Sequence, residues 1–196
     1  MKRLPDARHW VFDLDGTLTL AIHDFALIRR ELGIPPEHDI LHHLAALPAG
    51  EAAAKHAWLL AHEQQLALAA QPATGAIELV RQLSARGCRL CILTRNARPL
   101  AQLTLASIGL DGCFALDDII GRDEAPPKPD PGGLLMLARR WQVPTAELVM
   151  VGDYRFDLDC ARAVGATSVL VNLPENPWPE LADLFVRDCR ALLQQL

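Results

Sequence analysis

The feature that most constrains the fold of this chain is an alternation of strand-like and helix-like segments. Short apolar runs lie at residues 10–14, 88–93, 148–151 and 168–171. After Gly75 these runs are separated by amphipathic patterns, such as GAIELVRQLSARG and PGGLLMLARRW. Because strands that alternate with helices form parallel sheets, the chain is predicted to be an α/β protein built on a parallel sheet.

Local signals mark the ends of the predicted elements. Gly87 is expected to end the first of these helices, and Asp130 and Pro131 are predicted to be the N-cap and first residue of the second. Short apolar runs at residues 113–116 and 184–186 are predicted to add edge strands.

The alternation is interrupted between residues 20 and 71, where three helical patterns follow one another without a strand between them. The patterns are HDFALIRRELG, PEHDILHHLAAL and GEAAAKHAWLLAHEQQLALAA. The turn-forming sequence QPATG follows them. We therefore predict a core domain of residues 1–19 and 72–196, with a small helical domain of residues 20–71 inserted after the first strand.

Composition excludes several classes of partner. The chain has 196 residues and is 51% hydrophobic, which suffices for a sizeable core. Its net charge of -5 and the lack of a basic run disfavour binding to nucleic acid or an anionic membrane. No segment approaches the roughly 20 apolar residues of a membrane span, and the first ten residues do not resemble a signal peptide. A cytoplasmic protein is therefore expected.

Cysteine and histidine spacings give little support for a metal or redox site. Cys88 and Cys91 lie three residues apart on a predicted strand and should face opposite sides, which is poor geometry for a thiol pair. His38 and His42 have the i, i+4 spacing of a helical metal pair, but no third ligand stands near them. Solvated helix faces explain these histidines better.

Polar side chains follow the predicted strands at the points where the strands end. They are Asp13, Asp15, Thr94, Arg95, Asn96, Asp153 and Asp157. Because ligands bind at the carboxyl ends of parallel strands, these groups are expected to meet at one edge of the sheet. Lys128 lies in PPKPDP, where neighbouring prolines stiffen the backbone, and can join them.

This set of residues predicts a magnesium site that acts on phosphoryl groups. Asp13 and Asp15 would repel each other unless a cation offset their charges, and an oxygen-rich set of carboxylates suits Mg²⁺. A cation, a fixed ammonium and a hydroxyl also form the environment that a transferring phosphoryl group needs. Asp13 is then the natural nucleophile.

Four segments together resemble the signature motifs of the haloacid dehalogenase superfamily, in their usual order: DLDGT, the strand-ending Thr94, Lys128 in PPKPDP, and GDYRFD. The inserted helices resemble the cap of the phosphoglycolate phosphatase-like branch. The resemblance implies a Rossmann-like three-layer core with a small helical cap. It also implies a Mg²⁺-dependent phosphatase that hydrolyses a small phosphorylated metabolite through an aspartyl-phosphate intermediate.

The resemblance further implies a role for each matching residue. Asp13 would attack phosphorus, while Asp15 would protonate the leaving oxygen, later activate water, and bind Mg²⁺ through its backbone carbonyl. Asp153 would be the other metal ligand, and Asp157 would orient that ligand and the lysine without touching the ion. The remaining matches are Thr94 and Lys128, which would bind the phosphoryl group, and Gly16 and Thr17, which would shape the loop that positions the acid.

Candidate substrate contacts lie on both parts of the chain. Thr94, Arg95, Asn96 and Lys128 are the candidates on the core, with the alternative that Arg95 covers the neighbouring helix. His23, Arg29 and Arg30 are weaker candidates on the first inserted helix, where a salt-bridged surface is the favoured interpretation of the two arginines. Members of the branch often carry an Asp-Ser pair after the first motif, whereas this chain has Leu20 and Ala21. The substrate therefore cannot be carried over from the resemblance, and the oligomeric state is left open.

Other functions fit the sequence less well. A phosphomutase of the same superfamily uses the same four motifs and remains the alternative. A dehalogenase would need neither an acid such as Asp15 nor Mg²⁺. A non-catalytic binding protein that kept the fold would be expected to have lost a catalytic position, and none is lost. The sequence contains neither the GxGxxG nor the GxxxxGK[ST] pattern of nucleotide-binding folds.

Overall fold

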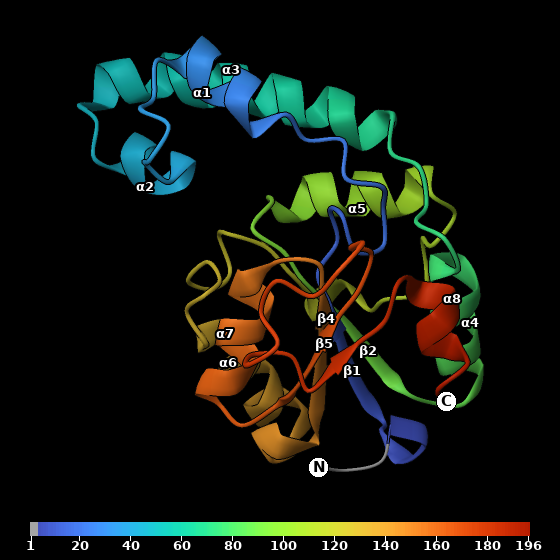
Figure 1. The fold of residues 1–196 in the computed structure, drawn as a ribbon. Coiled ribbons are helices and arrows are strands. Elements are labelled where there is room, and N and C mark those ends of the chain that lie inside the picture. The colour runs from blue at the N-terminus through green and yellow to red at the C-terminus, as the bar shows by residue number, and fades with distance from the viewer. Residues whose placement is uncertain (1–3) are drawn as a thin grey trace.

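The computed structural model describes residues 4–196, so the first three residues of the predicted core lie outside it. Within this range a single six-stranded sheet has the strand order β3-β2-β1-β4-β5-β6, and all neighbouring strands are parallel (Figure 1). The strands are β1 (His9–Phe12), β2 (Arg89–Leu93), β3 (Ile119–Ile120), β4 (Leu148–Gly152), β5 (Thr167–Leu170) and β6 (Leu184–Phe185). The predicted α/β fold with a parallel sheet is confirmed.

Helices connect the strands and cover both faces of the sheet. They are α1 (Phe25–Leu32), α2 (Ile40–Ala45), α3 (Ala49–Leu68), α4 (Ala76–Ala85), α5 (Arg98–Ser107), α6 (Gly132–Trp141), α7 (Arg155–Ala163) and α8 (Cys189–Leu193). Short 3-10 turns lie at Leu4–Asp6, Leu116–Asp118 and Thr145–Glu147.

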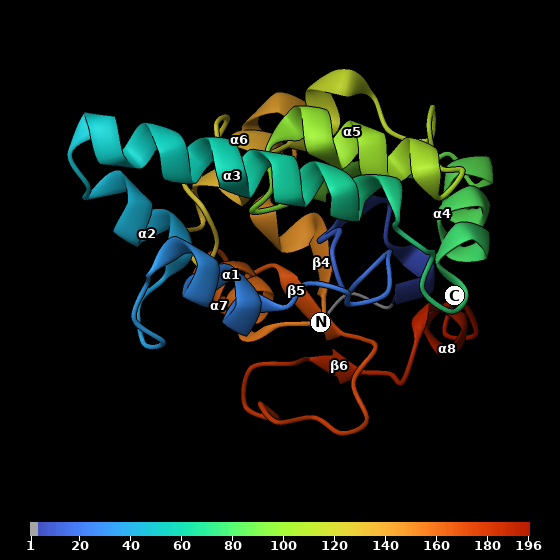
Figure 2. The ribbon, with the colours of Figure 1, turned by 90° about the horizontal axis from the view of Figure 1, so that it is seen from above.

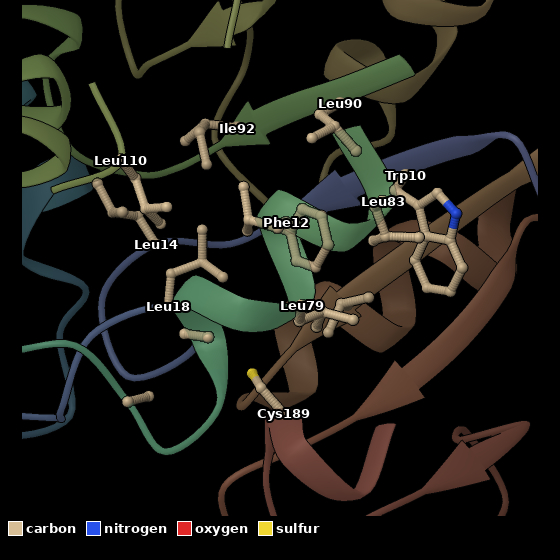
Figure 3. Close-up of a cluster of buried hydrophobic side chains, with 14 of the residues drawn as sticks. Trp10, Phe12, Leu14, Leu18, Leu79, Leu83, Leu90, Ile92, Leu110 and Cys189 are labelled. Carbon is tan, nitrogen blue, oxygen red and sulfur yellow. The ribbon is translucent and has the colours of Figure 1, made fainter. Parts of the chain in front are cut away.

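The core is divided by the sheet into two apolar clusters. Trp10 and Phe12 of β1 pack on one face against α4, α5 and α8 (Figure 3). Val11, between them, packs on the other face against α6 and α7. This follows from the two-residue period of a strand, which sends successive side chains to opposite faces. Apolar residues on both faces of β1 therefore bury it in the centre of the sheet.

The three inserted helices form a separate layer over the side where the strands end (Figure 1). They have their own small apolar cluster, made of Ile28, Leu32, Ile34, Leu44 and Leu59. Helix α3 runs alongside α5 of the core (Figure 2). The segments that enter and leave this layer are paired, since the Leu20 N–H donates to the Gln71 carbonyl at 2.9 Å. We propose that residues 20–71 are the cap and residues 1–19 and 72–196 the core.

Two predictions of local structure are wrong in detail. Residues 113–116 do not form a strand: the Cys113 N–H bonds back to the Leu110 carbonyl in a turn, a 3-10 turn follows, and the edge strand β3 comes later. The edge strand predicted at residues 184–186 is confirmed as β6. Helix α6 is capped by Pro131 rather than Asp130, although the Asp130 carboxylate still accepts a hydrogen bond from the Gly132 N–H at 2.7 Å.

His38 and His42 do not share a helix face. Asp39 is the N-cap of α2, so His38 lies before the helix and its ring faces His43, with 3.1 Å between the two Nδ1 atoms. The i, i+4 spacing therefore does not describe these two side chains. All five cysteines lie in the described range and are free thiols. Within residues 4–196, each helix is too short or too polar to span a bilayer.

Candidate active site

A cavity of about 510 Å³ lies between the strand ends and the inserted helices. The order of the strands reverses at β1, which pairs with β2 on one side and β4 on the other. Such a switch point is where open α/β sheets bind ligands. Asp13 follows β1 at this point, and its N–H still donates to the Val151 carbonyl of β4 at 2.9 Å. The end of the sheet therefore fixes Asp13 at the floor of the cavity.

The loop after Asp13 passes against Asp153. Gly16 has a φ of +88°, and a Cβ atom there would lie 2.4 Å from a carboxylate oxygen of Asp153. Thr17 donates from its hydroxyl to the other oxygen of Asp153 at 2.8 Å. The Asn172 side chain stabilises the same loop by donating to the Gly16 and Thr17 carbonyls, each at 2.8 Å. Glycine is thus required where the loop meets the carboxylate.

Lys128 binds two of the predicted carboxylates at once. Its ammonium lies 2.7 Å from an oxygen of Asp13 and 2.6 Å from an oxygen of Asp157, and the side chain is buried. Burial lowers the pKa of Lys128, but the charges of Asp13 and Asp157 outweigh it and raise the pKa above its usual value. The lysine is therefore a fixed positive charge throughout the neutral pH range.

Three carboxylates lie close enough to hold a cation. Asp13, Asp153 and Asp157 each offer an oxygen within 4.8 Å of the others. Burial, with the charges of Asp13 and Asp157, raises the pKa of Asp153 to about 8. Both Asp157 oxygens accept hydrogen bonds, one from Lys128 and one from the Tyr154 N–H at 3.2 Å. The cluster carries more negative charge than Lys128 offsets, and its hard oxygen donors fit a Mg²⁺ ion.

Asp15 is a carboxyl group suited to give up and take back a proton near neutral pH. Burial raises its pKa to about 7, and the charge of Asp13 acts in the same direction. A hydrogen bond from the Asn96 side chain opposes this shift. Because catalytic acids work best with a pKa close to the operating pH, the surroundings of Asp15 favour acid–base chemistry.

Thr94 lines the cavity where β2 ends. Its N–H donates to the Ile120 carbonyl of β3 at 3.0 Å, so its backbone position is set by the sheet. The Thr94 hydroxyl accepts a hydrogen bond from the Asn96 N–H at 3.0 Å, and both side chains are buried. The hydroxyl can still donate its own proton to an oxygen in the cavity.

The inserted helices supply part of the cavity wall. His23 and Arg29, two of the weaker candidates for substrate contact, line it, and burial lowers the pKa of His23. Arg30 does not line it: its side chain is 71% exposed and pairs with Glu31. Arg30 thus has the salt-bridged surface position that the sequence favoured for it, because residues next to each other on a helix point in different directions.

Two ion pairs across the cavity were not predicted from the sequence. Arg122 binds Glu63 of α3 through two parallel bonds of 2.9 and 3.0 Å, and Arg95 binds Asp39 at 2.5 Å. Burial raises the pKa of Asp39, but hydrogen bonds from Arg95 and the His42 N–H outweigh it and lower the pKa. Each pair joins the inserted helices to the core. Glu63 had a detectable signal, since it lies four residues from the buried Leu59 on an apolar helix stripe.

Comparison with known proteins assigns the chain to a family. Residues 8–165 match the haloacid dehalogenase-like hydrolases. A phosphoglycolate phosphatase of Rhodospirillum rubrum is 31% identical, over 91% of this chain and 86% of that protein. An uncharacterized hydrolase of Saccharomyces cerevisiae is 29% identical, over 94% of this chain and 88% of that protein.

Solved structures share the fold. A hydrolase from Pseudomonas syringae superposes with a TM-score of 0.74 at 24% identity, over 96% of each chain. CbbY from Rhodobacter sphaeroides, solved in complex with phosphate, gives a TM-score of 0.72 at 18% identity, over 97% of this chain and 99% of that one. Both matches extend through the inserted helices as well as the sheet.

Proposed function

Because the chain belongs to the haloacid dehalogenase-like hydrolases and is a phosphatase similar to the phosphoglycolate phosphatases, we propose that it hydrolyses a small phosphorylated metabolite. The reaction would use Mg²⁺ and pass through an aspartyl-phosphate intermediate. The observation that carries the proposal is Lys128, whose buried ammonium lies 2.7 Å from Asp13 beside an acidic cluster. A nucleophile, a fixed cation and a metal-binding set thus meet at one point.

Asp13 and Asp153 would hold the metal with their carboxylates, and Asp15 with its backbone carbonyl. Asp157 would act indirectly, because Lys128 and the Tyr154 N–H occupy its oxygens. When bound, Mg²⁺ would offset the negative charge shared by these carboxylates and the phosphoryl group.

In the first step, an Asp13 oxygen attacks phosphorus in line with the ester oxygen. The new bond joins phosphorus to Asp13, and the bond from phosphorus to the leaving oxygen breaks. Asp15 gives that oxygen its proton. In the second step, ionised Asp15 takes a proton from water, whose oxygen attacks phosphorus and frees Asp13. In both steps the Lys128 ammonium offsets the negative charge of the phosphoryl oxygens, and the Thr94 hydroxyl donates a hydrogen bond to them.

The metal requirement is tested by phosphate release from p-nitrophenyl phosphate. We expect turnover with Mg²⁺, near-complete loss in excess chelator, and recovery when Mg²⁺ is restored, because the carboxylates and the phosphate dianion repel each other without a cation. Full activity in excess chelator would contradict the metal assignment.

A second experiment distinguishes a phosphatase from the phosphomutase alternative. With a natural sugar phosphate as substrate, a phosphatase releases inorganic phosphate, whereas a phosphomutase forms an isomeric sugar phosphate.

Stability should depend on pH in the metal-free protein. The folded-state pKa of Asp153 is raised from 3.8 to about 8, so the unfolded chain binds fewer protons between these values. Thermal stability should therefore fall as pH rises from about 4 to 8, and Mg²⁺ should raise Tm more at pH 8 than at pH 5. Calorimetry with and without Mg²⁺ measures this, with Asp153→Asn as the variant in which the difference shrinks. An equal Mg²⁺ effect at both pH values would rule out this linkage.

A further inference from the structure

Arg95 lies next to Thr94, at the boundary between the sheet and the inserted helices. Its guanidinium donates to Asp39 at the start of α2, with 2.5 Å between Nη2 and Oδ2. The guanidinium also lies over the Phe156 ring, 5.0 Å from the ring centre. These two contacts come from opposite sides of the cavity, because Phe156 belongs to α7 of the core. The side chain is therefore held in one orientation before any substrate binds.

One donor of this oriented side chain is unused. The Nε atom of Arg95 is buried and has no hydrogen-bond partner within residues 4–196. Buried donors in folded proteins are nearly always satisfied, so this nitrogen is a polar group that the described chain leaves without an acceptor. Arg95 is one of the residues that line the 510 Å³ cavity.

Arg29 of α1 brings a second guanidinium to the same place. It donates to the His38 and Phe25 carbonyls at 3.2 and 3.4 Å, and within the described part of the chain it makes no ion pair. His38 and Asp39 are consecutive, so the two arginines hold adjacent residues of one segment. Asp39 offsets the positive charge of Arg95 through their ion pair. Glu37 also lines the cavity but is exposed, where solvent screens its charge.

Apolar side chains form another part of the cavity wall. Phe25, Ile28, Leu59 and Phe156 contribute to it. A cavity of this volume is far larger than a phosphoryl group needs and falls in the range that encloses a ligand with a substantial carbon body. The cavity thus contains the candidate phosphoryl-binding groups, an apolar part of its wall and two arginines.

We propose that Arg95, assisted by Arg29, determines specificity by binding an oxyanion at the far end of the leaving group. The substrate class is then a phosphomonoester in which an apolar chain or ring separates the phosphate from a carboxylate or a second phosphate. The proposal rests on the proposed function and deepens it. Arginine is suited to this task because its fixed fork of donors matches the geometry of both oxyanions.

The test compares three aryl phosphates that share one ring. Phenyl phosphate lacks a distal anion, 4-carboxyphenyl phosphate carries a carboxylate, and 1,4-phenylene bisphosphate carries a second phosphate. We expect kcat/KM to be about tenfold or more higher for at least one charged substrate than for phenyl phosphate, mainly through KM. Whichever of the two is preferred identifies the oxyanion.

The variants Arg95→Gln and Arg29→Gln should each bring that ratio toward one, while Arg95→Lys should keep part of it. Arg30→Gln is the matched control, because Arg30 neighbours Arg29 on α1 but is 71% exposed and lies outside the cavity. A ratio near one in the unmodified enzyme, or a ratio unchanged in both glutamine variants, would overturn the proposal.

Binding measurements test this proposal independently of whether the proposed phosphatase function is correct. Calorimetric titration of 4-carboxyphenyl phosphate and phenyl phosphate into the Asp13→Asn variant measures the subsite without turnover. Tighter binding of the carboxylated compound, weakened by adding Arg95→Gln, supports the subsite even if no substrate is hydrolysed. Equal binding of the two compounds contradicts it even if both are hydrolysed by the unmodified enzyme.

Discussion

Replacing Asp13 with Asn is expected to lower kcat by a factor of about 10⁴ or more while the protein still folds. The side chains have nearly the same shape, but the amide lacks the charged oxygen that attacks phosphorus. Folding should persist because Lys128 keeps its 2.6 Å contact with Asp157. The change also removes one negative charge from a crowded acidic cluster. Steady-state phosphate release and thermal unfolding, measured on the same preparation, test both parts.

Asp111→Asn is the matched control, because Asp111 is an exposed aspartate outside the cavity. It should retain the activity of the unmodified enzyme. Activity of Asp13→Asn within about tenfold of that of the control would show that another group attacks phosphorus.

Replacing Asp15 with Asn should slow hydrolysis of alkyl phosphates by a factor of about 10² to 10⁴, the usual contribution of a general acid. The substitution should slow the first step of p-nitrophenyl phosphate hydrolysis less, because nitrophenolate leaves without a proton. In the unmodified enzyme, the raised pKa of Asp15, about 7, keeps the acid protonated below neutrality. The rate of phosphoenzyme formation from alkyl phosphates should therefore fall as pH rises through 7.

Rapid-quench kinetics on substrates with different leaving-group acidities measure this step. The variant should show a steeper dependence of the rate on leaving-group acidity than the unmodified enzyme, and it should lack the decline above pH 7. If Asp15→Asn slowed the first step equally for every leaving group, Asp15 would not be the acid.

The sheet and the centre of the site could be predicted because their signals are local. Short apolar runs located β1, β2, β4 and β5, and the polar residues that follow strands are brought together by the parallel topology itself. Asp13 and Asp153 follow adjacent strands, so the pairing of β1 with β4 places them side by side. The sequence alone was therefore enough to predict the meeting of these acids with Lys128.

Contacts between the inserted helices and the core could not be predicted in the same way. Arg122 and Glu63 are 59 residues apart, and no periodicity links a loop residue to a helix residue. Asn172 hydrogen-bonds to the loop after Asp13 but lies 156 residues after Gly16, and no local sequence pattern links the two residues. Such pairs depend on how two layers pack, which is decided by the shapes of many side chains rather than by the spacing of a few.

The most direct test of the mechanism is detection of the phosphoenzyme. The enzyme would be mixed with a ³²P-labelled alkyl phosphate and Mg²⁺, quenched in acid within milliseconds, and digested for mass spectrometry. We predict label on the peptide that carries Asp13, with a mass increase at that residue, and no label in Asp13→Asn. Labelled protein that accumulates in Asp15→Asn would fit the second step, in which Asp15 activates water. Rapid phosphate release with no labelled peptide at any quench time, or label on a different residue, would contradict nucleophilic attack by Asp13.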